Sequence, residues 1–190
     1  MAFDTVLEVV ALSDPGIVRA NNEDAVLAKA ARGVVILADG MGGYNAGEVA
    51  SEMATTLLGA GLEKAFASRS PDARDAAGRP WAHVALENEV ALVNAAIHQA
   101  ARSQPQYAGM GTTLVAGIFH DNRLTVAHIG DSRVYRLRGD AFEQITRDHS
   151  LLQEQLDSGL LTREEARHAQ HKNLVTRALG VDPEVAVEMH

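Results

Sequence analysis

The sequence contains no cysteine, which excludes disulfide bonds, thiolate metal sites, iron–sulfur clusters and a cysteine nucleophile. It also lacks any apolar run long enough to cross a membrane. The first twelve residues carry Asp4 and Glu8 but no basic segment, so they do not resemble a signal peptide. We therefore expect a soluble, cytoplasmic protein without a membrane segment.

Positive charge is also scarce. Lysine and arginine number 17 against 25 aspartates and glutamates, which gives a net charge of −8. This balance argues against nucleic acid or an anionic membrane as the main partner. Acidic side chains are instead the ligands that hard cations such as Mg²⁺ and Mn²⁺ require.

The chain of 190 residues, 46% of them apolar, is long enough for one domain with a sizeable core. Apolar and β-branched runs predict strands at 6–12, 24–30, 33–38, 112–119, 124–129, 134–137 and 142–145. Apolar residues at helical spacing predict helices at 47–66, 81–102, 151–158 and 162–169. Strands, two long helices and a strand meander, in that order, predict an α+β fold in which antiparallel sheet packs against helices.

Three of these predicted elements carry more detailed expectations. The continuous apolar run 33–38 is typical of a strand that is buried on both faces. Thr162 and Glu165 have the spacing of a capping box at a helix start. The predicted buried stripe of the first long helix consists of Val49, Met53, Leu57, Leu62 and Phe66.

Aspartates occupy three turns next to predicted strands. Asp39 follows the most apolar strand, Asp131 follows another, and Asp24 lies after Asn21, Asn22 and Glu23. Carboxylates brought together repel one another, and a divalent cation removes that conflict. However, a lone Asp-Gly pair or a lone Gly-Met-Gly-Gly stretch is more often an ordinary turn or loop, so spacing alone leaves both interpretations open.

Five blocks of sequence, read in order, help to decide between ordinary turns and a metal site. They are SDPGIVRANNEDA (13–25); LADGMGG (37–43) with AGEVAS (46–51); GMGTT (109–113); HIGDSRVY (128–135); and TRDHSL (146–151) followed by NLVTRALG (173–180). Together they run nearly from end to end. With these blocks the chain resembles the bacterial branch of the metal-dependent serine/threonine protein phosphatases, the PPM or type 2C family.

The resemblance implies two stacked, mainly antiparallel β-sheets flanked by helices, an αββα sandwich. It implies hydrolysis of phosphoserine and phosphothreonine in proteins, with water activated by two Mn²⁺ or Mg²⁺ ions and a possible weaker third metal site. The implied partners are phosphoproteins, as substrates of a bacterial serine/threonine kinase.

The resemblance also assigns roles to individual residues. Asp39 matches the carboxylate that bridges the two metals, and the Gly40 carbonyl matches the ligand beside it. Asp24 matches a residue that holds metal-bound water, with Glu23 as support. Arg19 matches the arginine that grips the substrate phosphate. A ligand of the third metal corresponds to Asp131, and the mobile flap beside the site corresponds to about 150–172.

The sequence departs from the family pattern in two places. Met41 stands where eukaryotic relatives have a histidine proposed as general acid, so the proton donor stays unassigned. The family's two later carboxylate motifs have no counterpart after Gly180. We therefore expect 1–190 to be a single but incomplete domain, with C-terminal strands missing and the second metal short of two carboxylates. A truncated, non-catalytic pseudophosphatase that binds phosphopeptides or a kinase is the alternative function.

The remaining polar residues receive structural interpretations. The block 109–113 is expected to form a close-packed turn into a strand rather than to take part in catalysis. His149 is expected to hydrogen-bond within its own turn. The other histidines, His128 and His190 among them, lack metal-ligand spacing and are interpreted as surface or packing residues.

Overall fold

A computed structural model describes residues 6–19, 21–43, 46–169 and 174–190. The strands are β1 (Asp24–Lys29), β2 (Val34–Met41), β3 (Gly111–Thr112), β4 (Leu114–His120), β5 (Arg123–Ile129), β6 (Tyr135–Arg138), β7 (Ala141–Gln144) and β8 (Glu188–Met189). The α-helices are α1 (Ala46–Ser68), α2 (Trp81–Ser103), α3 (Leu151–Asp157) and α4 (Arg163–His168). Short 3₁₀ turns cover Ala30–Arg32 and Pro105–Tyr107. Within these residues, no helix combines the length and apolar character needed to span a bilayer.

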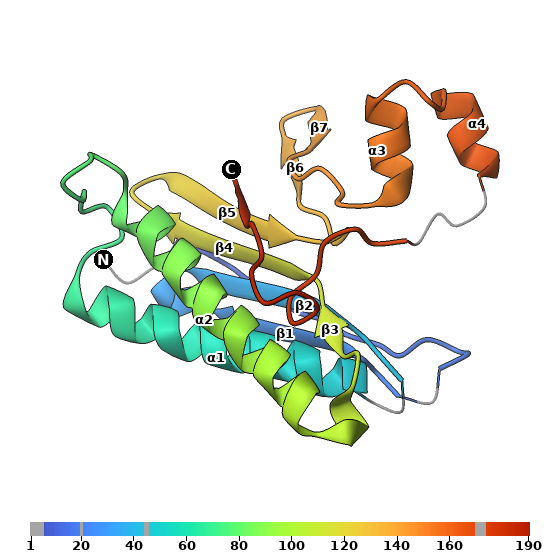
Figure 1. Cartoon of the computed structure of the whole chain (residues 1–190). Coiled ribbons are helices and arrows are strands. Elements are labelled where there is room, and N and C mark those ends of the chain that lie inside the picture. Colours follow the sequence, from blue (N-terminus) through green and yellow to red (C-terminus); the bar gives the residue numbers. More distant parts are fainter. Residues whose placement is uncertain (1–5, 20, 44–45, 170–173) are drawn as a thin grey trace.

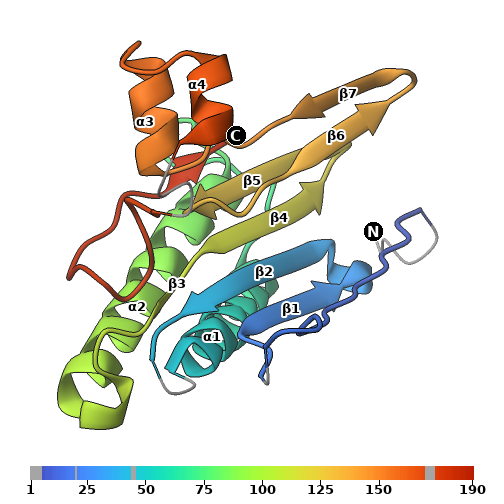
Figure 2. The same ribbon diagram turned by 90° about the vertical axis from the view of Figure 1, so that its right-hand side faces the viewer.

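One antiparallel sheet forms the centre of the fold, in the order β1-β2-β4-β5-β8, with β3 paired to β2 (Figure 1). The long helices α1 and α2 both lie against the same face of this sheet (Figure 2). The main core lies between these two layers, where Ile36, Leu58, Leu86, Ile97 and Ile118 are each at most 1% exposed. The two long helices and the strand meander predicted from sequence are therefore confirmed, as is the α+β class.

The inner face of α1 differs from the expected stripe. Small residues fill most of it: Ala46, Gly47, Ala50, Ser51, Ala54, Thr55 and Gly59 are buried beside Leu58 and Leu62. Leu57, expected inside, is 40% exposed. An added Cβ at Gly59 would lie only 2.2 Å from Leu27 Cδ2, so the helix backbone approaches β1 too closely for larger side chains.

Burial alternates along β2, so the expectation of a strand buried on both faces is wrong. Val34, Ile36 and Ala38 point into the core, whereas Leu37 on the other face is 40% exposed. The reason is that α1 and α2 cover only one face of the sheet (Figure 2). The predicted strand 6–12 is also not a strand. Its residues 9–12 instead line a groove against the second face, together with Val26, Leu37 and Val115.

The second sheet consists, among the described residues, of the hairpin β6–β7 alone. It stands above the main sheet in Figure 1, and Figure 2 shows that it projects away from α3 and α4. The predicted capping box is confirmed at α4, where Thr162 Oγ1 accepts from Glu165 N and Glu165 Oε2 accepts from Thr162 N. Antiparallel sheets with flanking helices are thus confirmed, while the absence of C-terminal strands stays a prediction.

The adjacent leucines of α1 provide a test of this packing. Leu58→Ala should lower the free energy of unfolding by about 2–5 kcal/mol, because a fully buried leucine leaves a cavity. Leu57→Ala should cost about 0.5 kcal/mol or less, since its side chain is partly in solvent. Urea denaturation of both variants measures the difference. Equal losses would contradict the assignment of the inner face.

Candidate functional site

Strand topology brings the three predicted aspartates to one edge of the sheet. Asp24 begins β1 and is paired directly with Asp39 near the end of β2. Because β2 and β5 both pair antiparallel with β4, they run in the same direction and end at the same edge. Asp131 follows the last residue of β5 by two positions. The candidate site is therefore assembled by strand register and not by loops alone.

The backbone of Asp39 is held by two adjacent threonines. Its N–H donates to Thr113 Oγ1 over 3.0 Å, and its carbonyl accepts from Thr113 N over 2.9 Å. The Thr112 hydroxyl donates to the same carbonyl over 3.0 Å. Block 109–113 is thus architectural, as expected, and its structural role is to fix the residue that carries the central carboxylate.

Thr113 also reaches the third aspartate's turn. Its hydroxyl lies 2.7 Å from the hydroxyl of Ser132, which follows Asp131. Gly130, which precedes Asp131, has φ +98°, and an added Cβ would lie 2.7 Å from Thr113 Cγ2. Only glycine therefore lets the two segments approach this closely. The turns that carry Asp39 and Asp131 form one connected unit.

Gly40 and Gly47 bring the start of α1 against the end of β2. A Cβ on Gly40 would lie 2.0 Å from the Gly47 carbonyl oxygen, and one on Gly47 would lie 2.7 Å from Glu23 Oε1. The Glu23 carbonyl accepts from Gly40 N over 2.9 Å. Glu23 Oε2 also pairs with Arg19 at 3.5 Å, although the arginine side chain is 64% exposed. Glu23 therefore links the arginine to the backbone beside Asp39.

The site carries unrelieved negative charge. The pKa of Asp39 is raised to about 6, first by partial burial and then by repulsion from the Asp24 carboxylate and a hydrogen bond with it. Asp131 repels Asp39 as well, whereas Arg19 acts in the opposite direction. The four residues thus interact electrostatically, as the sequence predicted for neighbours in one site.

This donor set fits a hard divalent cation. Several carboxylates and a close backbone supply oxygen ligands, which Mg²⁺ and Mn²⁺ prefer. A raised carboxyl pKa shows that the arrangement is costly without a compensating positive charge, and a bound cation supplies that charge. Asp39, Asp24 and the Gly40 carbonyl are the candidate groups to hold it, with Asp131 on the adjoining turn.

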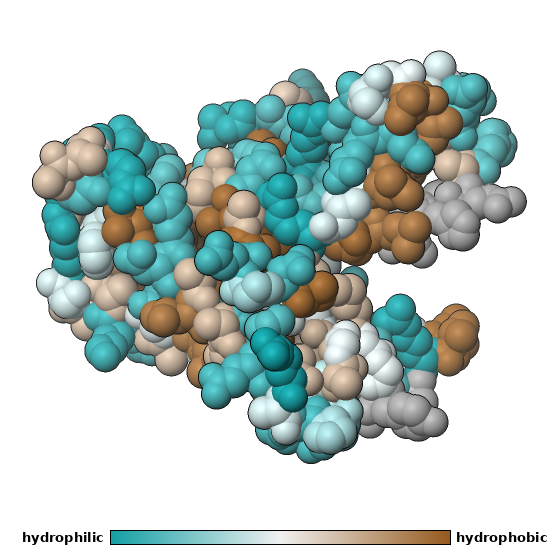
Figure 3. Space-filling model, viewed as in Figure 1, coloured by the Kyte–Doolittle hydropathy of each residue, from teal (hydrophilic) through white to brown (hydrophobic). Residues whose placement is uncertain are grey.

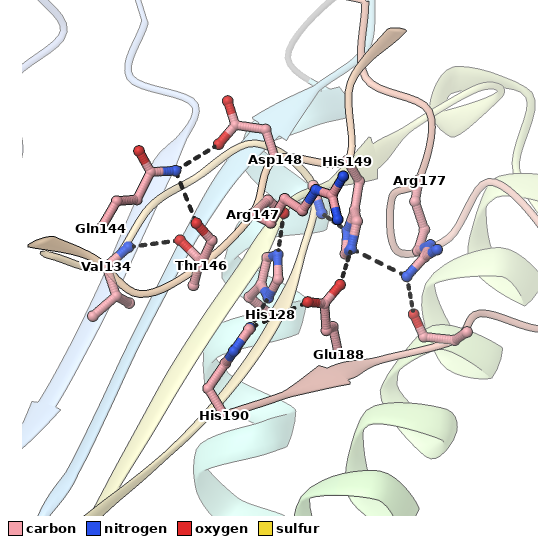
Figure 4. A network of polar contacts seen from close by, with 12 residues as sticks. His128, Val134, Gln144, Thr146, Arg147, Asp148, His149, Arg177, Glu188 and His190 are labelled. Carbon is pink, nitrogen blue, oxygen red and sulfur yellow. Dashed lines mark hydrogen bonds and ion pairs between the residues drawn. The ribbon is translucent and has the colours of Figure 1, made fainter. Parts of the chain in front are cut away.

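Sequence reasoning missed a polar cluster beside this edge (Figure 4). His149 accepts from Gly130 N over 3.0 Å and approaches Glu188 at 3.1 Å, so it joins separate segments and does not merely bond within its own turn. His128 stacks on His149 at 4.5 Å, and His190 lies 3.3 Å from His128. Burial lowers the pKa of His128, which favours the neutral ring. Their separation of up to 62 positions gave no local spacing signal.

Residues 18–180 match the family model for protein phosphatase 2C. The chain belongs to the protein phosphatase 2C family, and the antiparallel sheets, the flanking helices and the acidic edge are what this membership would require. It is 42% identical over 182 residues to protein phosphatase PhpP of Streptococcus pneumoniae, covering 94% of this chain and 70% of that protein.

Solved structures agree with this assignment. The Mycobacterium tuberculosis serine/threonine phosphatase PstP matches with a TM-score of 0.77 at 40% identity, over 94% of this chain and 71% of that chain. The catalytic domain of PstP in complex with two manganese ions matches with a TM-score of 0.74 at 39% identity, over 94% and 70%. The family is metal-dependent. The manganese ions of that complex belong to the class of hard cations that suits the acidic edge.

The charge conflict predicts that Asp39→Asn stabilises the metal-free protein. Folded Asp39 keeps its proton up to about pH 6, whereas the unfolded chain releases it near 3.8, so stability falls as pH rises through this window. The variant lacks the charge. Its Tm in EDTA at pH 7.5 should therefore exceed that of the wild type, by about 2–4 °C for each kcal/mol of electrostatic destabilisation that the substitution removes. The gain should vanish near pH 3.5.

Thermal scans in EDTA at both pH values measure this gain, and Asp140→Asn provides the matched control. Asp140 is exposed in the β6–β7 turn, so its substitution should leave Tm nearly unchanged. A lower Tm for Asp39→Asn at pH 7.5 would show that the carboxylate is not electrostatically strained.

Proposed function

We propose that the chain is a metal-dependent protein phosphatase that hydrolyses phosphoserine and phosphothreonine. The observation that carries the proposal is the convergence of Asp24, Asp39, Asp131 and Arg19 in one interacting group at the sheet edge. The named relatives are serine/threonine phosphatases that share most of this chain.

Each residue has a defined task in this proposal. Asp39, the Gly40 carbonyl and Asp24 hold two Mn²⁺ or Mg²⁺ ions, and Asp131 serves a weaker third site. When bound, such ions neutralise the phosphate and activate a water. Thr112 and Thr113 keep the Asp39 backbone from shifting. This rigidity matters because catalysis of phosphoryl transfer rests mainly on positioning and electrostatics.

Arg19 is proposed to bind the substrate phosphate. Its guanidinium is exposed and can donate two parallel hydrogen bonds to phosphate oxygens, which an ammonium group does less well. The contact with Glu23 Oε2, at 3.5 Å, restrains the arginine without burying it. The guanidinium therefore stays available to an incoming phosphoester.

The segment 150–172 is proposed as a flap beside the site, although 170–172 lie outside the described residues. It carries α3 and α4, and Arg147 forms an ion pair with Asp157 at its base. Figure 3 shows the surface notched between the part of the molecule that carries these helices and the part below it. A protein substrate could enter from this side.

Substrates made by a bacterial serine/threonine kinase and a cytoplasmic location belong to the same proposal. The relatives that support it are bacterial phosphatases. The alternative of a non-catalytic pseudophosphatase finds no support in them. It predicts phosphopeptide binding without turnover, and the activity experiment below distinguishes the two.

Hydrolysis of p-nitrophenyl phosphate and of a phosphothreonine peptide by the 190-residue chain tests the function. Turnover should require Mn²⁺ and stop in EDTA. Asp39→Asn should lower kcat/KM about 100-fold or more, since it removes charge from the metal-binding group, while Asp140→Asn should retain it. Turnover that persists in EDTA or in Asp39→Asn would refute the proposed site.

Arg19→Ala tests phosphate capture separately from metal binding. It should lower kcat/KM about 10–100-fold, mostly through KM, because a charged hydrogen-bonding group contributes about 1.5–3 kcal/mol. The Mn²⁺ concentration that gives half-maximal activity should stay the same. Arg19→Lys should recover only part of the loss. A changed Mn²⁺ requirement would instead place Arg19 in the metal site.

A further inference from the structure

Two histidines and a glutamate converge where β8 pairs with β5 (Figure 4). His128 Nδ1 lies 3.3 Å from His190 Nε2, and that nitrogen lies 3.5 Å from Glu188 Oε1. One nitrogen or oxygen atom from each of the three residues falls within 4.8 Å of the others. None of the three is among the carboxylate-site residues described above.

Hydrogen bonds decide which ring nitrogen of each buried histidine carries the proton. His128 Nε2 lies 2.7 Å from the Arg147 carbonyl oxygen, which can only accept. The proton of neutral His128 is therefore on Nε2, and Nδ1 presents a lone pair to His190 Nε2. A buried lone pair that faces another potential ligand atom is the arrangement that a metal ligand requires.

His149 orients Glu188 through a hydrogen bond, and its own tautomer is fixed by a backbone contact. Its Nδ1 accepts from the Gly130 N–H, so its Nε2 carries a proton and donates to Glu188 Oε2 over 3.1 Å. Arg177 Nη1 lies beside that nitrogen at 3.1 Å and donates to the Ala186 carbonyl. One carboxylate oxygen is thus held by a histidine, which leaves Oε1 facing His190. Such supporting partners orient metal ligands in known sites.

Two of the three separations between the candidate ligand atoms match those around a tetrahedral ion. Metal–ligand bonds of about 2.0–2.1 Å at tetrahedral angles separate ligand atoms by about 3.3–3.4 Å, close to the observed 3.3 and 3.5 Å. We propose that His128 Nδ1, His190 Nε2 and a Glu188 carboxylate oxygen bind a single Zn²⁺-class ion. The side chains of His190 and Glu188 are 23% and 39% exposed, so an ion can enter and keep a water as fourth ligand.

This site differs from the acidic edge in its chemistry. Imidazole nitrogens favour Zn²⁺ and its neighbours, whereas all-oxygen ligands favour Mg²⁺ and Mn²⁺. The ion would fasten β8 to β5 and, through His149 and Gly130, to the turn that carries Asp131. Its role is therefore stabilisation of the fold next to the phosphatase site, and it does not depend on the proposed phosphatase activity.

Zn²⁺ titration calorimetry on the 190-residue chain in an Asp39→Asn background tests the proposal, since that background weakens the acidic site. One Zn²⁺ per chain should bind, and Co²⁺ should give the visible absorption of a four-coordinate nitrogen-ligated ion. A hundredfold excess of Zn²⁺ over its Kd should raise Tm by about 5–10 °C. His190→Ala should weaken Zn²⁺ binding by more than about 10–100-fold, which is the loss typical when a residue that only hydrogen-bonds to a metal ligand is removed.

Two further variants make the result decisive. Glu188→Gln keeps the shape of the side chain and should also weaken Zn²⁺ binding, which covers the case in which His190→Ala fails to fold. His168→Ala removes an exposed histidine on α4 and should bind as the parent does. Absence of Zn²⁺ binding in the Asp39→Asn chain, or undiminished binding in both His190→Ala and Glu188→Gln, would overturn the proposal.

Discussion

The pairing of β1 with β2 sets Asp24 directly opposite Asp39, and repulsion between their carboxylates is the constraint on which the site depends. Strand register cannot relax this contact, because a slip by one residue would turn every core side chain of β2 outward. Besides the opposing charge of Arg19, the protein can lower the repulsion by protonation or by a bound cation. The same register that buries Ile36 therefore creates a site for positive charge.

The surroundings of Asp39 show how the fold withstands that repulsion. Thr113 bonds to both the N–H and the carbonyl of Asp39, and its hydroxyl also meets Ser132. Glycines at 40, 47 and 130 allow backbones to meet where any Cβ would collide. The contact between Gly40 and Gly47 is rigid because it involves main chain on both sides. The charged groups are thus held in place before any ligand arrives, which is the preorganisation that electrostatic catalysis needs.

Local patterns in the sequence sufficed for most of the elements but not for their faces. The long helices, the β6–β7 hairpin and the capping box at Thr162 follow from periodicity and turn chemistry. The buried face of α1 does not, because close approach to β1 selects small residues and leaves Leu57 outside. Asp24, Asp39 and Asp131 were found from local motifs, although Asp24 and Asp39 lie within β1 and β2 and not in turns. His128 and Glu188, by contrast, meet only through the β5–β8 pairing.

The acidic edge and the histidine cluster are connected at Gly130. This residue has a positive φ, contacts Thr113 on one side and donates its N–H to His149 on the other. Asp131 follows Gly130 immediately, so this short turn lies between the two donor sets. An ion bound by His128, Glu188 and His190 would restrict the Asp131 turn without entering the phosphatase site. The two sites would take different cations, because one donor set is all oxygen and the other includes imidazole nitrogen.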